Sequence, residues 1–244
     1  MRVRRQTVTY ISGLTLFMFF SFNVTACAQN VHSDSYSPQV IRKVPLGQKV
    51  VALTFDDGPS AEFTPKILHI LNQYHAKATF FVIGSRVERY PSLVRQLFYN
   101  DDEVANHSYS HTIMTRKRET TTETELDSTQ NAVETVLGYR QPRVFRPPFG
   151  RVDRTLLRTA RKKDYAVVLW SIDSHDWADP GVERIVNQVT SRVHNGDIIL
   201  FHDQGGNRKQ TVESVKRIIP ILQERGYEFV TVSELLNYSN LKRD

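Results

Sequence analysis

Residues 50–59, VVALTFDDGP, place two adjacent carboxylates directly after a run of β-forming residues. The first six residues of this stretch favour a strand, and the glycine and proline at its end turn the chain. Two ionised aspartates cannot lie unpaired inside a buried strand, because burying an uncompensated charge costs too much free energy. At the carboxyl end of a strand, Asp56 and Asp57 can instead face a crevice where a metal ion or an arginine compensates them. The stretch therefore predicts a functional site at a strand end.

Apolar runs and helical patterns alternate through the chain that follows. Strands are expected at 50–55, 78–83, 103–106, 143–146, 165–172, 197–201 and 227–232, and helices at 61–74, 90–98, 120–137, 152–163, 182–193 and 212–225, with a short helix at the end. Strands that are apolar on both faces and alternate with helices indicate a parallel sheet covered by helices.

The length of this region decides between a complete and a shortened barrel. A full eight-stranded barrel needs about 250 residues, whereas residues 49–244 provide 196. We therefore expect an α/β fold: an irregular, shortened (β/α) barrel of about seven parallel strands, with the active site at its carboxyl-terminal rim.

The N-terminus predicts export. A positively charged start precedes an uncharged run at 10–26, which is the layout of a secretory signal, and the run is close to the short limit for a membrane span. Residues 24–27 resemble a bacterial lipobox in which Cys27 would carry the lipid. Simple cleavage after residue 28 and an uncleaved anchor stay open as alternatives.

The expected organisation is a signal peptide or anchor at 1–27, a polar linker at 28–48 and a catalytic domain at 49–244. All three forms of the N-terminus place the domain outside the cytoplasm, either extracellular, periplasmic or anchored to the membrane and facing outward. Cys27 is the only cysteine, so the mature domain needs no disulfide.

The net charge of +6 fits either a solvated basic surface or attraction to an anionic polymer or membrane. No nucleic-acid-binding signature is present, which removes that class of partner.

Polar residues follow five of the expected strands. The first strand ends in Asp56-Asp57, and later strands end in the segments 107–111, 146–150, 173–177 and 201–203. In parallel α/β barrels the chemistry lies at this face of the sheet. Each segment alone is a weak signal, but five strands that deliver titratable residues to one rim predict an active site.

The residue types indicate metal-assisted chemistry. Two imidazoles four residues apart and one carboxylate form a ligand set that leaves positions open on a metal. Such a metal lowers the pKa of bound water and polarises a carbonyl, a second carboxylate can take a proton, and a separate histidine can protonate a leaving group. The same ligand set also serves iron oxygenases, although the additional acid and base favour hydrolysis.

Five motifs occur in order: TFDDG (54–58), HSYSH (107–111), RPPFG (146–150), DSHDW (173–177) and LFH (200–202). With these motifs the chain resembles the NodB-like polysaccharide deacetylases, carbohydrate esterase family four, over about residues 49–232. All five motifs in order at plausible spacing make the resemblance specific.

The resemblance implies a role for each matched residue. Asp57, His107 and His111 would bind a divalent metal, usually zinc in this family, with cobalt or another divalent ion sometimes active. Asp56 would be the general base, and Arg146 would hold it in its ionised form and orient it.

The remaining matched residues would act on the leaving group and the substrate. His202 would be the general acid, and Asp176 would hold its imidazolium. The backbone N–H of Phe149 would stabilise the oxyanion, and Trp177 and Leu200 would line the pocket for the acetyl methyl group.

Two positions need separate comment. Phe149 stands where many members carry tyrosine; catalysis through its backbone N–H is expected to survive, but a sugar contact through the missing hydroxyl is lost. His175 lies at a variable position, where a substrate contact and an ordinary exposed residue both fit.

The implied reaction is hydrolysis of N-acetyl groups from an amino-sugar polysaccharide, with release of acetate. Peptidoglycan or another exported N-acetylglucosamine polymer is favoured over chitin. The alternatives are O-deacetylation of a polymer such as xylan, and a non-catalytic carbohydrate-binding relative.

Overall fold

The structure is a computed structural model that describes residues 40–139 and 141–240. Its strands are β1 (Val40–Ile41), β2 (Val50–Asp56), β3 (Ala78–Val82), β4 (Glu103–Asn106), β5 (Val144–Phe145), β6 (Ala166–Val168), β7 (Ile172–Asp173), β8 (Ile198–His202) and β9 (Glu228–Phe229). Its helices are α1 (Thr64–Gln73), α2 (Gly84–Arg89), α3 (Pro91–Tyr99), α4 (Glu119–Leu137), α5 (Arg154–Lys162), α6 (Val182–Thr190), α7 (Lys209–Glu224) and α8 (Val232–Asn240), with 3₁₀ turns η1 (Pro148–Gly150) and η2 (Asp176–Ala178).

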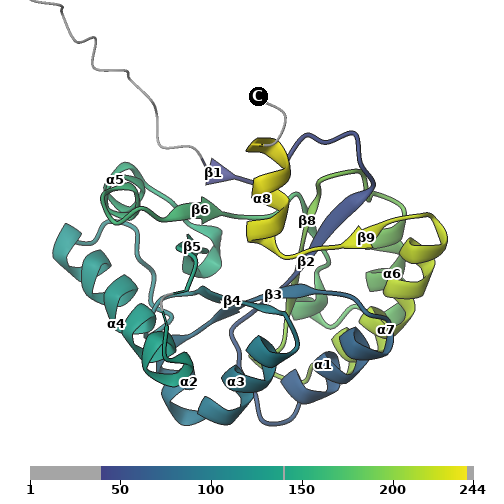
Figure 1. Cartoon of the computed structure of the whole chain (residues 1–244), viewed down its shortest axis with the longest axis horizontal. Coiled ribbons are helices and arrows are strands. Elements are labelled where there is room, and N and C mark those ends of the chain that lie inside the picture. The colour runs from purple at the N-terminus through teal and green to yellow at the C-terminus, as the bar shows by residue number, and fades with distance from the viewer. Residues whose placement is uncertain (1–39, 140, 241–244) are drawn as a thin grey trace, which may run out of the picture. The chain divides into compact units, whose positions relative to one another are not determined.

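The strands form one curved parallel sheet in the order β1-β6-β5-β4-β3-β2-β8-β7, and β9 pairs with the start of β2. Every strand-to-strand pairing within the described residues is parallel. Helices α1 to α4, α6 and α7 lie along the outside of this curve (Figure 1). The predicted α/β architecture, an irregular and shortened parallel barrel, is confirmed.

Strand β2 runs through the middle of the sheet and is buried along its whole length. Its alternate residues Val51, Leu53 and Phe55 pack against the outer helices, and Phe55 stacks on Phe80 at 5.0 Å between ring centroids. Val50 and Ala52 face a second apolar cluster inside the curve. Because side chains alternate along a strand, Thr54 and Asp56 also face the interior, which is where the site lies.

The predicted strand 165–172 is one segment that changes partners. Its first part, β6, pairs with β5 and β1, and its last part, β7, pairs with β8 at the other end of the sheet. Between them, Leu169 N donates to Ile41 O at 2.7 Å and Ser171 N donates to Ile198 O at 3.0 Å. The segment therefore connects the two ends of the sheet and closes the barrel, so the expectation of a single unbroken strand was wrong.

The predicted linker 28–48 overlaps the folded domain. Val40 and Ile41 form β1, Val44 is buried, and Val44 N donates to the carbonyl of Gly196 at 2.9 Å. The polar composition of 28–48 gave no sign of these contacts. The start of the folded domain, expected at residue 49, therefore lies earlier in the chain. The predicted signal at 1–27, with Cys27, and the linker residues 28–39 lie outside the described residues.

The predicted helix 90–98 is preceded by a short helix, α2, that the sequence pattern missed. Tyr90 leaves helical geometry between α2 and α3, as expected of a residue before proline. Within residues 40–139 and 141–240, no helix has the length and hydropathy needed to cross a membrane.

The contact between Val44 and Gly196 gives a test of the packing of residues 40–44 against the folded domain. An alanine Cβ at Gly196 would lie 1.6 Å from the Val44 carbonyl oxygen, whereas a Cβ at Gly138 would meet nothing within 4 Å. Both glycines have nearly the same left-handed backbone, with φ of +78° and +80°. We expect Gly138→Ala to cost about 1 kcal/mol and Gly196→Ala to cost about 1–3 kcal/mol more through overpacking, measured as urea unfolding free energies. Equal losses in the two variants would contradict the docking of Val44.

Candidate active site

The carboxyl ends of the central strands bring the predicted residues to one cleft of about 400 Å³. Asp56 ends β2 directly beside His202 at the end of β8, since the two residues are paired in the strand register. The cleft is lined by Asp56, Asp57, His107, His111, Phe149, Gly150, Trp170, Asp173, Trp177, Leu200, His202 and Arg208.

Arg146 follows β5 and lies fully buried inside the barrel. Its NH1 donates to Asp56 Oδ1 at 2.7 Å and to Thr54 Oγ1 at 2.8 Å. Its Nε and NH2 donate to the carbonyls of Val168 and Leu169 at 3.3 and 3.0 Å. A buried charge needs both a counter-charge and hydrogen bonds, and Arg146 has both. The contact predicted between Arg146 and Asp56 is therefore present.

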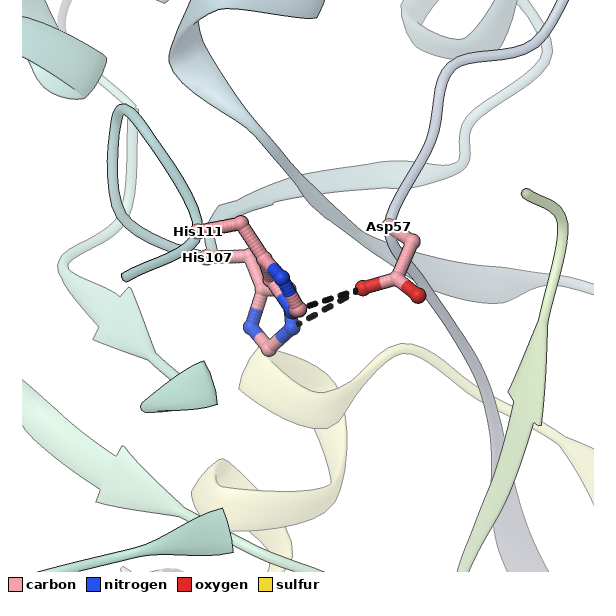
Figure 2. Close-up of side chains that lie close together, drawn as sticks. All are labelled: Asp57, His107 and His111. Carbon is pink, nitrogen blue, oxygen red and sulfur yellow. Dashed lines mark ion pairs between the residues drawn. The ribbon is translucent and has the colours of Figure 1, made fainter. Parts of the chain in front are cut away.

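Asp57, His107 and His111 converge as a possible metal site. Asp57 Oδ1 lies 3.4 Å from His107 Nε2 and 3.0 Å from His111 Nε2, and Figure 2 shows both rings directed at this oxygen. One ligand atom from each residue lies within 4.8 Å of the others. The backbones of Asp57 and His111 have φ of 76° and 54°. Such conformations cost free energy and are typical of functional sites.

Local contacts prepare this set for a cation. His107 Nδ1 lies 2.7 Å from the carbonyl oxygen of Arg146. A carbonyl can only accept, so Nδ1 carries the proton and Nε2 is directed toward Asp57. Burial alone would raise the pKa of Asp57, but hydrogen bonds from His107 and His111 and the charges of His107 and His202 outweigh burial and hold that pKa well below its usual range. The carboxylate is ionised, as metal binding requires.

His202 lines the same cleft as this set and is held by Asp176. His202 Nδ1 is 2.8 Å from Asp176 Oδ1, and His202 N donates to Asp176 Oδ2 at 2.9 Å. Thr211 Oγ1 donates to the same Oδ2 at 2.7 Å. Burial opposes protonation of His202, but the hydrogen bond and charge of Asp176 prevail and raise its pKa to about 9. His202 is therefore an imidazolium at neutral pH, with Nδ1 engaged and Nε2 left as the second donor.

The three residues predicted to contact substrate also lie in the cleft. Phe149 is exposed, has a left-handed backbone with φ of 60°, and its ring lies 4.8 Å from that of His111. Trp177 is exposed and its Nε1 donates to Asp173 Oδ1 at 3.3 Å. Leu200 is buried on the wall of the cleft. His175 is exposed at the rim with φ of 58°, and it is not among the residues that line the catalytic cleft.

Sequence reasoning missed four residues that shape the site. Thr54 could have been found, because it shares the face of Asp56 two positions along a strand. Trp170 lies in the segment that closes the barrel, where no pattern marked it. Arg208 is buried, lines the cleft and donates to the Asp176 carbonyl at 3.2 Å. It follows the LFH motif in a loop, and nothing in its local sequence distinguishes it.

Asp203 is the fourth missed residue, and it explains why Gly58 follows the two aspartates. A Cβ at Gly58 would lie 2.2 Å from Asp203 Oδ2, so only glycine lets the turn pack here. Burial raises the pKa of Asp203 to about 7, against a hydrogen bond from Thr64 that lowers it. Asp203 N also donates to the Asp56 carbonyl at 3.2 Å. The contacts of Asp203 with Asp56 and Gly58 thus hold the turn after β2 in place.

Comparison with known proteins identifies the family. Residues 43–168 match the sequence profile of polysaccharide deacetylases. The chain belongs to the polysaccharide deacetylase family. It is thus a hydrolase of carbon–nitrogen bonds other than peptide bonds, and the family depends on a divalent metal.

Relatives of this deacetylase act on more than one polymer. A peptidoglycan-N-acetylglucosamine deacetylase of Bacillus cereus is 43% identical over 81% of this chain and 93% of its own. A chitooligosaccharide deacetylase of Bradyrhizobium sp. is 37% identical over 78% of this chain and 91% of its own.

Solved structures share the fold. The Bc1960 peptidoglycan N-acetylglucosamine deacetylase matches with a TM-score of 0.78 and 34% identity over 80% of this chain and 92% of that one. A family four pseudoenzyme from Bacillus anthracis matches with a TM-score of 0.76 and 28% identity over 82% of this chain and 69% of that one. The fold therefore occurs both in an active deacetylase and in a pseudoenzyme.

The Asp176–His202 pair predicts that the free energy of unfolding depends on pH. The folded pKa of His202 is raised to about 9 from 6.5. The pair therefore stabilises the fold fully below pH 6.5, and the contribution is lost as the pH rises through about 9. Asp176→Asn should lower the pKa of His202, followed by NMR titration of its ring. The deficit in unfolding free energy of this variant should be largest at low pH and shrink across that range.

Thr211→Val is the matched control, since it removes a hydrogen bond from the same carboxylate but keeps the charge. The shift in the His202 pKa should be much smaller in this variant. A His202 pKa that is unchanged by Asp176→Asn would refute the assigned cause.

Proposed function

We propose that this deacetylase hydrolyses N-acetyl groups of an exported amino-sugar polysaccharide, with peptidoglycan as the substrate and zinc as the metal. The observation that carries the proposal is the arrangement of the cleft. One cleft brings together a ligand set of one carboxylate and two imidazoles, a carboxylate paired with arginine and a histidine paired with aspartate.

The donor set fits zinc. Carboxylate oxygen and imidazole nitrogen are ligands that zinc accepts, and three protein ligands leave a position for water or substrate. Asp57, His107 and His111 would hold the ion, which supplies Lewis-acid activation of the water and of the acetyl carbonyl. Cobalt or another divalent ion is compatible with the same three ligands.

The protein side chains move the protons. Asp56 Oδ2 lies 3.8 Å from His107 Nε2, beside the ligand set, while Oδ1 is occupied by Arg146. Asp56 accepts the proton of the attacking water, and His202 donates from Nε2 to the departing nitrogen. The Phe149 N–H stabilises the oxyanion, and Trp177 and Leu200 enclose the methyl group. The products are acetate and a free amine.

The high pKa of His202 favours an amide substrate. An amine leaving group must be protonated as the carbon–nitrogen bond breaks, whereas an alkoxide leaving group needs less help from an acid. A histidine whose pKa is raised by the hydrogen bond and charge of Asp176 suits the first task. O-deacetylation of a polymer such as xylan is the second candidate, supported by the fold that these esterases share.

The presence of both the acid and the base, each with its charged partner, argues against the two remaining alternatives. A non-catalytic relative would have no need for both the Asp56–Arg146 and the Asp176–His202 pairs. An iron oxygenase would need the ligand set but neither the acid nor the base. Peptidoglycan is preferred to chitin because the more similar of the two curated relatives acts on peptidoglycan. An exported chain, held at the membrane by an N-terminal anchor or by lipid on Cys27, would meet that polymer.

We predict that Asp56→Asn retains zinc but loses acetate release by a factor of about 10²–10⁴, the usual contribution of a general base. The substitution keeps the shape of the side chain and an oxygen that accepts from Arg146, but it removes the basicity and the charge, so the variant is expected to fold with lower stability. Zinc content per chain and acetate released from peptidoglycan measure the two effects separately.

His111→Ala is the opposite variant, expected to lose zinc and activity together, while His69→Ala on the exposed face of α1 should change neither. Acetylated xylan and chitin oligomers are assayed beside peptidoglycan. Full turnover in Asp56→Asn would remove the base assignment. Acetate from xylan with none from the N-acetylated polymers would establish the esterase alternative.

A further inference from the structure

A second hollow, of about 660 Å³, adjoins the catalytic cleft. Trp170 and Asp173 line both hollows, so the segment that closes the barrel forms a wall between them. The second hollow is also lined by residues that do not line the cleft, among them Arg42, Lys43, Gln188, Arg192, His194 and Asp197. These residues come from the ends of β1 and α6 and from the start of β8.

The two acidic residues of this hollow are already engaged. Asp197 is buried and pairs with Lys43 at 2.8 Å, and it accepts a hydrogen bond from Ser171 Oγ at 2.9 Å. Asp173 Oδ1 accepts from His175 N at 2.8 Å and from Trp177 Nε1 at 3.3 Å. Lys43 therefore compensates Asp197, and neither carboxylate forms an ion pair with Arg42 or Arg192 within the described residues.

Arg42 and Arg192 remain as exposed cations. Neither forms an ion pair within residues 40–139 and 141–240. Two guanidinium groups in one hollow raise the local concentration of anions and bind carboxylates with bidentate geometry. A neutral oligosaccharide does not need them.

The wall between the hollows is held in place. Gln188 Nε2 donates to the Asp173 carbonyl at 3.0 Å and lies 3.3 Å from His175 Nδ1. His175 ends this wall at the rim, with its ring 6.0 Å from that of Trp177. A polymer seated in the cleft beside Trp177 can therefore extend into the second hollow past the residues that the two hollows share.

We propose that Arg42 and Arg192 form a subsite that binds a carboxylate carried by the polysaccharide beside the sugar that loses its acetyl group. The inference rests on the proposed function, because the same polymer occupies the cleft. Peptidoglycan carries such carboxylates on its peptide substituents, and on its lactyl ether wherever the peptide has been removed, whereas chitin carries none. The subsite therefore selects the acidic polymer over the neutral one. A phosphate polymer offers related chemistry and is a separate arm of the test.

The test compares a peptidoglycan fragment that has free carboxylates with the same fragment after amidation. Binding to the zinc-loaded full chain is measured by calorimetry. We expect the wild-type protein to bind the acidic fragment about tenfold more tightly, as two exposed ion pairs provide. Arg42→Gln/Arg192→Gln should lose this preference and keep its affinity for the amidated fragment.

Arg154→Gln/Lys216→Gln is the matched control, because it removes the same charge from exposed positions outside both hollows and should keep the preference. Acetate release from the wild-type protein is assayed in parallel. A preference for the acidic fragment without acetate release would support the subsite and reject the proposed function.

Three results would overturn the subsite. The first is an undiminished preference in Arg42→Gln/Arg192→Gln. The second is an equal loss of affinity for both fragments, which would give the arginines a role in the fold or in general glycan contact. The third is tighter binding of a polyglycerol phosphate than of the acidic fragment, lost in the same variant, which would assign the arginines to phosphate.

Discussion

The buried ion pair between Arg146 and Asp56 is the interaction on which the rest of the site depends. A guanidinium with no exposure can stay inside the barrel only because Asp56, Thr54 and two backbone carbonyls satisfy it. Removing one partner of such a pair typically costs about 3–5 kcal/mol, since the other charge stays buried. The fold therefore depends on the same contact that orients the proposed base.

Arg146 also connects parts of the chain that are far apart in sequence. Its side chain binds the carbonyls of Val168 and Leu169, where the segment leaves β6 to close the barrel. Its own carbonyl accepts a hydrogen bond from His107 Nδ1–H, which leaves Nε2 directed toward the other metal ligands. One residue thereby sets the closure of the barrel, the position of the base and the orientation of a metal ligand.

Local patterns predicted the elements of this site, and tertiary contacts supplied what the patterns lacked. The apolar run before Asp56 and the motifs around His107, Arg146 and His202 could be found because strand ends are marked by abrupt changes in polarity. The change of partners within 165–172 could not, because both halves of that segment are apolar and a strand pattern does not name its neighbours. Arg208 was missed for a related reason: its role comes from Asp176, a distant residue that loop sequence does not specify.

The geometry separates two aspartates that are adjacent in sequence. Asp56 is the last residue of β2, faces the interior and pairs with Arg146, whereas Asp57 has left the strand with φ of 76° and faces the two histidines. A crystal structure of the zinc-loaded protein tests this division most directly. We predict an ion about 2.0–2.2 Å from an Asp57 oxygen and from one nitrogen each of His107 and His111, with Asp56 outside the coordination sphere and still bound to Arg146. Zinc coordinated by Asp56, or bound without Asp57, would contradict the account.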